Sequence, residues 1–178
     1  MELSAAEKET LHEIARQSIL AGLRGEPAPP LPQLTGVLQE PRGAFVTLHK
    51  KGALRGCIGY IEAIKPLAAT VQEMAYAAAF NDPRFPPLKP VEFKDIDIEI
   101  SVLSPLRRIH NIDEIQVGRH GLYICRGPYR GLLLPQVATE YRWDRETFLQ
   151  QTCRKANLPP TAWQDPQTEI YVFSAEIF

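Results

Sequence analysis

The sequence predicts a mixed fold of helices and β-strands in one compact domain. Residues 4–23 combine a helix-capping pattern with apolar periodicity. Two strand-like runs, 44–49 and 54–60, flank a tight turn, and residues 95–102 alternate strictly between polar and apolar side chains. A chain of 178 residues is long enough to bury a sizeable core.

Composition excludes several classes of protein. The 20 Lys and Arg residues against 21 Asp and Glu leave a net charge of -1, so no global field attracts nucleic acid or a membrane surface. Cys57, Cys125 and Cys153 are widely spaced and odd in number, which favours a reduced, cytoplasmic protein. The four histidines show no ligand spacing, so we expect no metal and no cofactor. Residues 1–4 show no signal peptide, and no apolar run could cross a bilayer.

The first helix has a clear start. Ser4 is the expected N-cap, and Glu7 three residues later completes a capping box that opens a helix to about Leu23. The proline-rich segment 25–41 cannot continue this helix. We therefore predict an extended connector that lies against the body of the protein.

The hairpin loop sets the register of the next two strands. A two-residue loop would place Val46 and Leu48 on the same face as Arg55 and Cys57. A three-residue loop, Lys50-Lys51-Gly52, separates these apolar side chains from the charged pair, and its glycine suits a left-handed position. We predict the three-residue loop.

Cys57 is the strongest candidate for a reactive residue. Arg55, two positions away on the same predicted face, would favour the thiolate. Gly56 and Gly59 leave room for a ligand or another chain segment to approach. In the predicted register His49 is on the order of 13 Å away, too far for a Cys–His pair. The alternative is a structural cysteine in a well-packed strand, and the residues alone leave both readings open.

A second helix and a stiff loop follow. Pro66 marks the first turn of a helix to about Phe80, whose many alanines suit close packing against a sheet. The proline-rich loop after it carries Asp82, Arg84 and Phe85, and such a loop can hold functional groups in place. In the alternative reading Asp82 and Arg84 pair locally and Phe85 fills the core.

Residues 95–102 form the clearest predicted strand. Ile96, Ile98, Ile100 and Val102 should face the core, and Asp95, Asp97, Glu99 and Ser101 should face the other way. If this strand joins the sheet of the hairpin, its acidic face also carries Arg55 and Cys57. Glu99 is then the first candidate to pair with Arg55 or to act as the missing base. A solvated charged face is the alternative.

The C-terminal part alternates short elements. We expect a helical turn at 111–115, a glycine-bracketed turn at 118–121, a strand pair at 122–125 and 131–134, a helix capped by Asp144, and a final strand at 169–173. His120 in the glycine-bracketed turn could reach a site or have a local backbone role. Cys153 should lie on the buried face of the helix.

These motifs carry a resemblance. The run Leu54-Arg55-Gly56-Cys57-Ile58-Gly59 resembles the hallmark of the AMMECR-one domain family, and the similarity extends over nearly the whole chain. Further family blocks match residues 82–85, 99–104, 118–121, 133–138 with Glu140 and Trp143, and 153–156 with Leu158 and Pro159. Asn157, at a helix C-cap, stands where the family usually has glycine.

The resemblance implies an α+β fold with a central antiparallel sheet flanked by helices. It further implies one domain over residues 1–178, with two unequal lobes and the termini packed together in the larger one. Short single-domain members resemble protein A of the AmmeMemoRadiSam system, which is associated with Memo-like and radical SAM proteins. The resemblance supplies no established reaction.

Together these observations define a candidate site and three candidate functions. The expected catalytic residues are Cys57, Arg55 and Glu99, and the expected ligand-binding residues are Gly56, Gly59, Asp82, Arg84, Ser101, His120 and Gln136. The favoured function is a system component that binds a small anionic ligand in a cleft around residues 54–59. The alternative is a thiol enzyme, with Cys57 as nucleophile and Glu99 or His120 as proton carrier. An RNA-binding module is the third candidate, and the net charge disfavours it.

Overall fold

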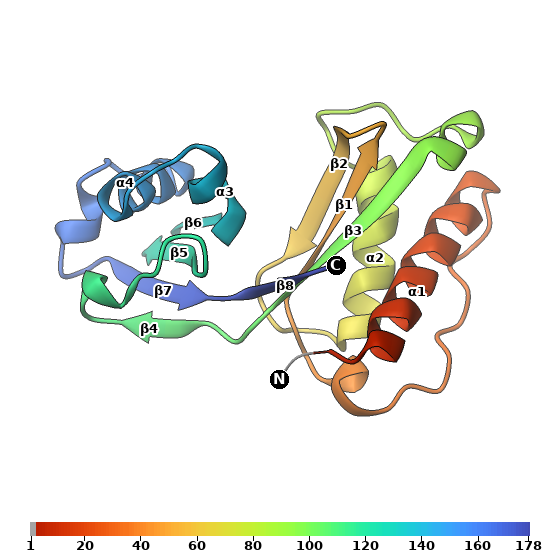
Figure 1. Cartoon of the computed structure of the whole chain (residues 1–178), viewed down its shortest axis with the longest axis horizontal. Coiled ribbons are helices and arrows are strands. Elements are labelled where there is room, and N and C mark those ends of the chain that lie inside the picture. Colours follow the sequence, from red (N-terminus) through yellow and green to blue (C-terminus); the bar gives the residue numbers. More distant parts are fainter. Residues whose placement is uncertain (1–2) are drawn as a thin grey trace. The chain divides into compact units, whose positions relative to one another are not determined.

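The computed structural model describes residues 3–178, which form two compact units. The first unit comprises residues up to 103 together with 176–178, and the second comprises 104–175. Each unit contains a four-stranded antiparallel sheet with helices packed against it, which confirms the predicted α+β class (Figure 1). Met1 and Glu2, part of the segment expected to lack a signal peptide, lie outside the described residues.

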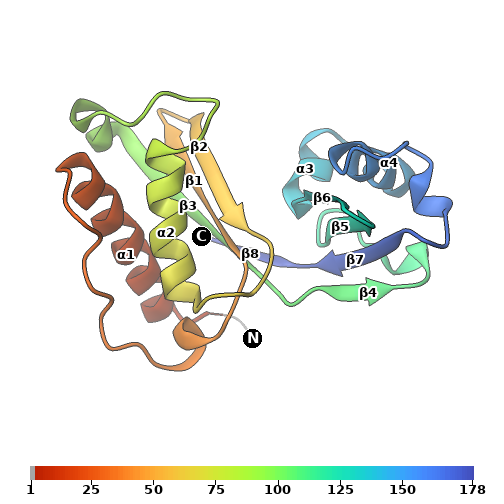
Figure 2. The same ribbon diagram turned by 180° about the vertical axis from the view of Figure 1, so that it is seen from behind.

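In the first unit, two helices cover one face of the sheet. Its strands, in the order β2-β1-β3-β8, are β1 (Ala44–Lys50), β2 (Ala53–Tyr60), β3 (Ile96–Leu103) and β8 (Ala175–Ile177). The helices are α1 (Ala5–Leu23) and α2 (Leu67–Phe80), with short 3₁₀ turns η1 (Gly36–Gln39) and η2 (Pro90–Asp95). Figure 2 shows both helices on the same side of the sheet.

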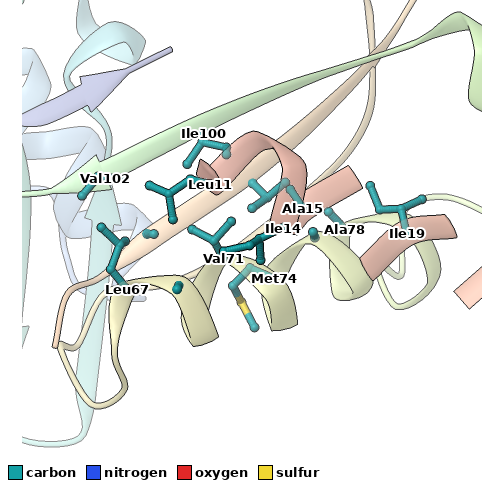
Figure 3. Close-up of a cluster of buried hydrophobic side chains, with 14 of the residues drawn as sticks. Leu11, Ile14, Ala15, Ile19, Leu67, Val71, Met74, Ala78, Ile100 and Val102 are labelled. Atoms are coloured by element: carbon teal, nitrogen blue, oxygen red, sulfur yellow. The ribbon is translucent and has the colours of Figure 1, made fainter. Parts of the chain in front are cut away.

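The core of this unit lies between these helices and the sheet (Figure 3). Leu11 and Ile14 of α1, three residues apart, face Val71 of α2 and Ile100 of β3. The helical and strand periods bring these positions to one side of each element. Each fully buried aliphatic side chain contributes roughly 1.5–3 kcal/mol to folding. The predicted inward face of β3 is confirmed.

The predicted start of α1 is also confirmed. The Glu7 N–H donates to Ser4 Oγ at 3.3 Å, and the Ser4 N–H donates to the Glu7 carboxylate at 2.8 Å. The Leu3 N–H donates to the Glu176 carboxylate at 3.0 Å, so the two ends of the described chain meet in this unit. The Gln72 amide donates to the carbonyl of Pro29 at 2.8 Å, and the connector thus lies against α2 as expected.

The predicted three-residue hairpin loop is wrong. Lys50 pairs with Ala53, and the two turn residues, Lys51 and Gly52, have φ angles of 51° and 80°. Two left-handed residues are typical of the tight turn that matches strand twist. The register then shifts between Leu48 and His49, which makes Arg55 the extra residue of a β-bulge. A two-residue loop in an unbroken ladder would mix apolar and charged side chains on one face, and the bulge at Arg55 prevents this mixing.

The second unit has its own sheet and core. Its strands, in the order β4-β7-β5-β6, are β4 (Arg107–Ile109), β5 (Gly121–Arg126), β6 (Tyr129–Leu133) and β7 (Glu169–Phe173). Its helices are α3 (Pro135–Glu140) and α4 (Arg145–Lys155), with 3₁₀ turns η3 (Ile112–Glu114) and η4 (Ala162–Gln164). Asp144 caps α4 by accepting from the Thr147 N–H at 2.8 Å, and Cys153 is buried as expected.

No helix within residues 3–178 is long and apolar enough to span a bilayer.

Candidate functional site

Cys57 lies in a row of polar side chains across three strands. Thr47 of β1 faces Cys57 on one side and Glu99 of β3 on the other. Because Val46 and Leu48 point into the core, this row lies on the face of the sheet opposite the helices. The Thr47 hydroxyl is 3.2 Å from Cys57 Sγ, and Cys57 is half-buried. The prediction that Cys57 and Glu99 share a face is confirmed.

Thr47 separates Cys57 from Glu99. Two strand spacings amount to about 10 Å, so these side chains start too far apart for direct contact. The side chain of Glu99 makes no hydrogen bond or ion pair with any residue in the described range 3–178.

His49 is nearer to Cys57 than the sequence suggested. It lies two residues from Thr47 on the same face of β1, about 7 Å along the strand. The expected separation of 13 Å was wrong because it depended on the wrong hairpin register. His49 pairs in register with Asp97 of β3. Its side chain makes no hydrogen bond to the residues that the structure describes.

Arg55 is directed to η2 and not to the acidic face of β3. Its Nε and Nη2 donate to the two carboxylate oxygens of Glu92 at 3.2 and 3.1 Å, and Nη2 also donates to the Pro86 carbonyl at 3.0 Å. The expected pairing of Arg55 with Glu99 is therefore wrong. The bulge displaces Arg55 from the alternation that would have placed it beside Cys57.

Glu92 is held as a carboxylate by several donors. Arg55 contributes most, Lys50 Nζ donates at 2.7 Å, and the Lys89 N–H donates at 3.0 Å. Together they lower the pKa of Glu92 to about 2. This carboxylate fixes the end of the hairpin to η2.

One donor of Arg55 remains unused. Arg55 is only 8% exposed, and its Nη1 is buried without a hydrogen-bond partner in the described part of the chain. Buried donors are nearly always satisfied in native proteins, by protein, water or ligand. Nη1 therefore marks a place for an acceptor oxygen.

Asp82 and Arg84 bind the free edge of β2. The buried Asp82 carboxylate accepts from the Cys57 N–H at 2.9 Å, while Arg84 Nη2 donates to the Cys57 carbonyl at 3.3 Å. The same carboxylate accepts from Arg84 Nε and Nη2 at 3.0 and 2.7 Å. This confirms local pairing of Asp82 with Arg84. The pair takes the place of a neighbouring strand at Cys57, which protects an open sheet edge.

The guanidinium of Arg84 holds the pKa of Asp82 far below its usual range, despite the burial of that carboxyl. In turn, Asp82 raises the pKa of Arg84. The pair is therefore ionic throughout the physiological range.

Phe85 lies beside both guanidiniums. The Cζ atoms of Arg55 and Arg84 are 5.9 and 5.5 Å from the centre of its ring. Cations at this distance are attracted to the face of an aromatic ring. Phe85 thus links the two arginines, and we call Arg55, Cys57, Asp82, Arg84 and Phe85 the Cys57 cluster.

The two motif glycines are close to other parts of the same unit. A Cβ at Gly56 would collide with the Ala78 carbonyl oxygen of α2. A Cβ at Gly59 would collide with the ring of Phe45 and lie 2.6 Å from the Ala44 carbonyl oxygen. Tight packing within the protein accounts for both glycines, and their contact with a ligand stays a prediction.

Ser101, His120 and Gln136 have separate surroundings. Ser101 is buried in β3, and no described residue bonds to its Oγ. His120 Nδ1 accepts from the Gln116 N–H at 3.2 Å, and burial, more than the nearby arginines, lowers the pKa of His120. Gln136, in the first turn of α3, has a buried Oε1 without a partner in the described chain. His120 and Gln136 belong to the second unit.

The sequence did not predict Glu92 and Thr47 as site residues, and it indicated Phe85 only as part of the proline-rich loop that carries Asp82 and Arg84. Pro90 and Glu92 at the first and third positions of a short helix form a helix-start pattern that indicates η2. That pattern does not show that Glu92 pairs with Arg55, which lies 37 residues away in the sequence. Within residues 3–178, no group of three or more His, Cys, Asp and Glu side chains is placed to hold a metal ion.

The fold and the site define a class: an α+β protein of two units in which a bulged edge strand presents an Arg-Gly-Cys motif. The chain belongs to the AMMECR1 family, whose model matches residues 12–178.

Relatives of similar length support this assignment. A protein of Methanothermobacter thermautotrophicus is 52% identical, with 99% of this chain and 95% of the relative covered. Protein MK0488 of Methanopyrus kandleri is 45% identical, covering 99% of this chain and 89% of the relative. The crystal structure of uncharacterized protein PH0010 from Pyrococcus horikoshii has a TM-score of 0.88 at 43% identity, over 95% of this chain and 89% of that one.

Proposed function

We propose that this chain binds a small anionic ligand at the Cys57 cluster, as a component of a system with Memo-like and radical SAM proteins. The observation that carries the ligand proposal is the buried Nη1 of Arg55, which has no acceptor among the described residues. A carboxylate or phosphate oxygen of a ligand would satisfy it with a charge-assisted hydrogen bond.

Arg84 provides a second contact for such a ligand. Its side chain is 55% exposed although it is anchored to Asp82, so its guanidinium is both accessible and fixed in orientation. A guanidinium held in advance loses little conformational freedom on binding. Glu92 and Asp82 already neutralise the two arginines, so the ligand would be held by directed hydrogen bonds more than by net charge.

The partner proposal rests on the family resemblance. In this proposal the radical SAM protein supplies the difficult chemistry, and this chain holds the substrate or product. Metabolite profiling tests it: a Cys57→Ser strain should accumulate the same compounds as a strain that lacks the radical SAM neighbour. A Cys125→Ser strain serves as the control and should match wild type. Different compounds in the first two strains would remove Cys57 from that pathway.

The second candidate is a thiol enzyme, and one observation favours it. Cys57, Thr47 and His49 share the face of the sheet opposite the helices, with the Thr47 hydroxyl within 3.2 Å of the thiol. In this reading Cys57 is the nucleophile, and His49 carries the proton.

The rate of alkylation by iodoacetamide tests the thiol enzyme. Peptide mapping at neutral pH should show Cys57 reacting at least about tenfold faster than free glutathione, and His49→Gln should slow it. Reaction no faster than that of glutathione would exclude the nucleophile and leave the ligand-binding proposal intact.

A further inference from the structure

The second unit contains a cavity where two strands separate. β4 and β7 pair at Ile109 and Ile170. Beyond this pair, β4 is followed along the chain by η3, and β7 is preceded by η4. The space between residues 108–112 and 163–170 is a cavity of about 480 Å³. This volume is typical of sites for small organic molecules.

The walls of this cavity combine apolar surface with hydrogen-bonding groups. Ile109, Ile112 and Ile170 contribute aliphatic surface, and Trp163 contributes a partly buried indole ring. The polar side chains in the wall include those of Asn111, Gln164 and Thr168.

Thr168 gives independent evidence for a ligand. The residue is only 8% exposed, and its Oγ1 is buried without a hydrogen-bond partner in the described chain. An unsatisfied buried hydroxyl is costly, and water or a ligand in the cavity can supply the missing hydrogen-bond partner. Asn111 also has free capacity, because its Oδ1 accepts from the Asp113 N–H while its amide hydrogens stay available.

The charged groups of the wall are already paired. Arg108 lies 3.3 Å from Glu169, and Asp165 lies 3.0 Å from Arg126. Asp165 also accepts from the Gln167 N–H at 2.8 Å. These pairs leave little uncompensated charge, which favours an uncharged ligand.

We propose that this cavity binds a planar, hydrogen-bonding heteroaromatic ring of the nucleobase kind, carried by an uncharged ligand of nucleoside size. The ring face would pack on Trp163 and the isoleucines, and its polar edge would bond to Thr168, Asn111 and Gln164. The proposal is independent of the Cys57 cluster, because every residue in it belongs to the second unit.

NMR titration of the full chain with adenosine, inosine, cytidine and uridine tests this inference. The chain has two tryptophans, so two indole N–H signals report on Trp163 and Trp143, and a Trp143→Phe variant assigns them. At least one nucleoside should shift the Trp163 signal saturably and leave that of Trp143 unchanged. If none of the four nucleosides shifts the Trp163 signal saturably at millimolar concentration, the proposal is overturned.

Thr168→Val tests the role of the hydroxyl. Loss of its hydrogen bond should weaken nucleoside binding on the order of tenfold. The melting temperature should not fall, since the substitution removes a polar group that has no partner in the described protein. Thr161→Val, at an exposed position, is the matched control and should change binding less than about twofold.

Two results would contradict this role of Thr168. One is wild-type affinity in Thr168→Val, and the other is an equal loss of affinity in Thr161→Val. If the valine variant fails to fold, Gln164→Ala at an exposed wall position replaces it, and wild-type affinity there overturns the proposed contacts.

Discussion

At the scale of single residues, the β-bulge gives Arg55 and Cys57 different partners. Arg55 is buried and fixes the hairpin to η2 through Glu92, while Cys57 stays half-buried beside Thr47. The Asp82–Arg84 pair holds both backbone groups of Cys57. Two residues that are only two positions apart in the motif therefore have separate structural roles.

Glu92→Gln should lower the free energy of unfolding by about 3 kcal/mol, because it leaves the buried guanidinium of Arg55 without a carboxylate. Urea unfolding measures this loss. Glu99→Gln is the matched control and should stay within about 0.5 kcal/mol of wild type. A loss of stability in Glu92→Gln no larger than that in Glu99→Gln would show that the Arg55–Glu92 pair is not a stabilising buried contact.

The lowered pKa of Glu92 predicts how the stability of the protein depends on pH. The pKa of Glu92 falls from 4.5 to about 2 on folding, chiefly through its bonds to Arg55. The unfolded state thus binds the proton first, so this stabilisation is complete above pH 4.5 and is lost as the pH falls towards 2. Urea unfolding at several pH values measures the free energy of unfolding. As the pH falls, this free energy should decrease less steeply in Glu92→Gln than in wild type. Parallel curves would contradict the assignment.

At the scale of elements, the two-residue turn and the bulge set the register together. Lys51 adopts a left-handed conformation that is costly for residues other than glycine, asparagine and aspartate. Gly56 beyond the bulge lets α2 approach the strand closely. The hairpin tolerates a strained turn because packing against α2 and η2 fixes the strand.

Lys51→Asn should raise the free energy of unfolding by about 0.5 kcal/mol, since Asn-Gly is a preferred pair in this turn type. Chemical denaturation measures the change. Lys94→Asn, an exposed lysine in η2, should give no comparable gain. A loss of stability in Lys51→Asn would indicate a different turn geometry.

Local patterns were sufficient for the long elements. The capping box of α1 and the alternation of β3 depend on residues near in sequence, and both predictions are confirmed. The bulge at Arg55 and its bond to Glu92 depend on the loop and turn that pack against β2, so the hairpin sequence does not determine them. The three-residue strands β4 and β8 are too short to show alternation.

At the scale of the whole molecule, each unit has its own hydrophobic core. One core lies between α1, α2 and the first sheet, and the other is centred on Phe148 and Leu149 of α4 with the second sheet. Separate cores predict separate cooperative units of local unfolding. The two proposed sites therefore belong to units with their own stability.

Leu149→Ala should reveal this independence, because the residue is fully buried and its truncation costs roughly 2–5 kcal/mol. Hydrogen exchange followed by mass spectrometry should lose protection mainly in residues 104–175. The matched variant Val71→Ala should lose it mainly in α1 and α2. Uniform loss across the chain in both variants would show one cooperative unit.

The most direct test of ligand binding at the Cys57 cluster is the identity of the small molecules that the native protein retains. Wild type, Arg84→Gln and the exposed control Arg24→Gln would be purified from lysate at low salt, and bound compounds extracted and identified by mass spectrometry. We expect a carboxylate- or phosphate-bearing compound in wild type and Arg24→Gln, and its loss from Arg84→Gln. If wild type retains no such compound above the level found in Arg84→Gln, the proposal is contradicted.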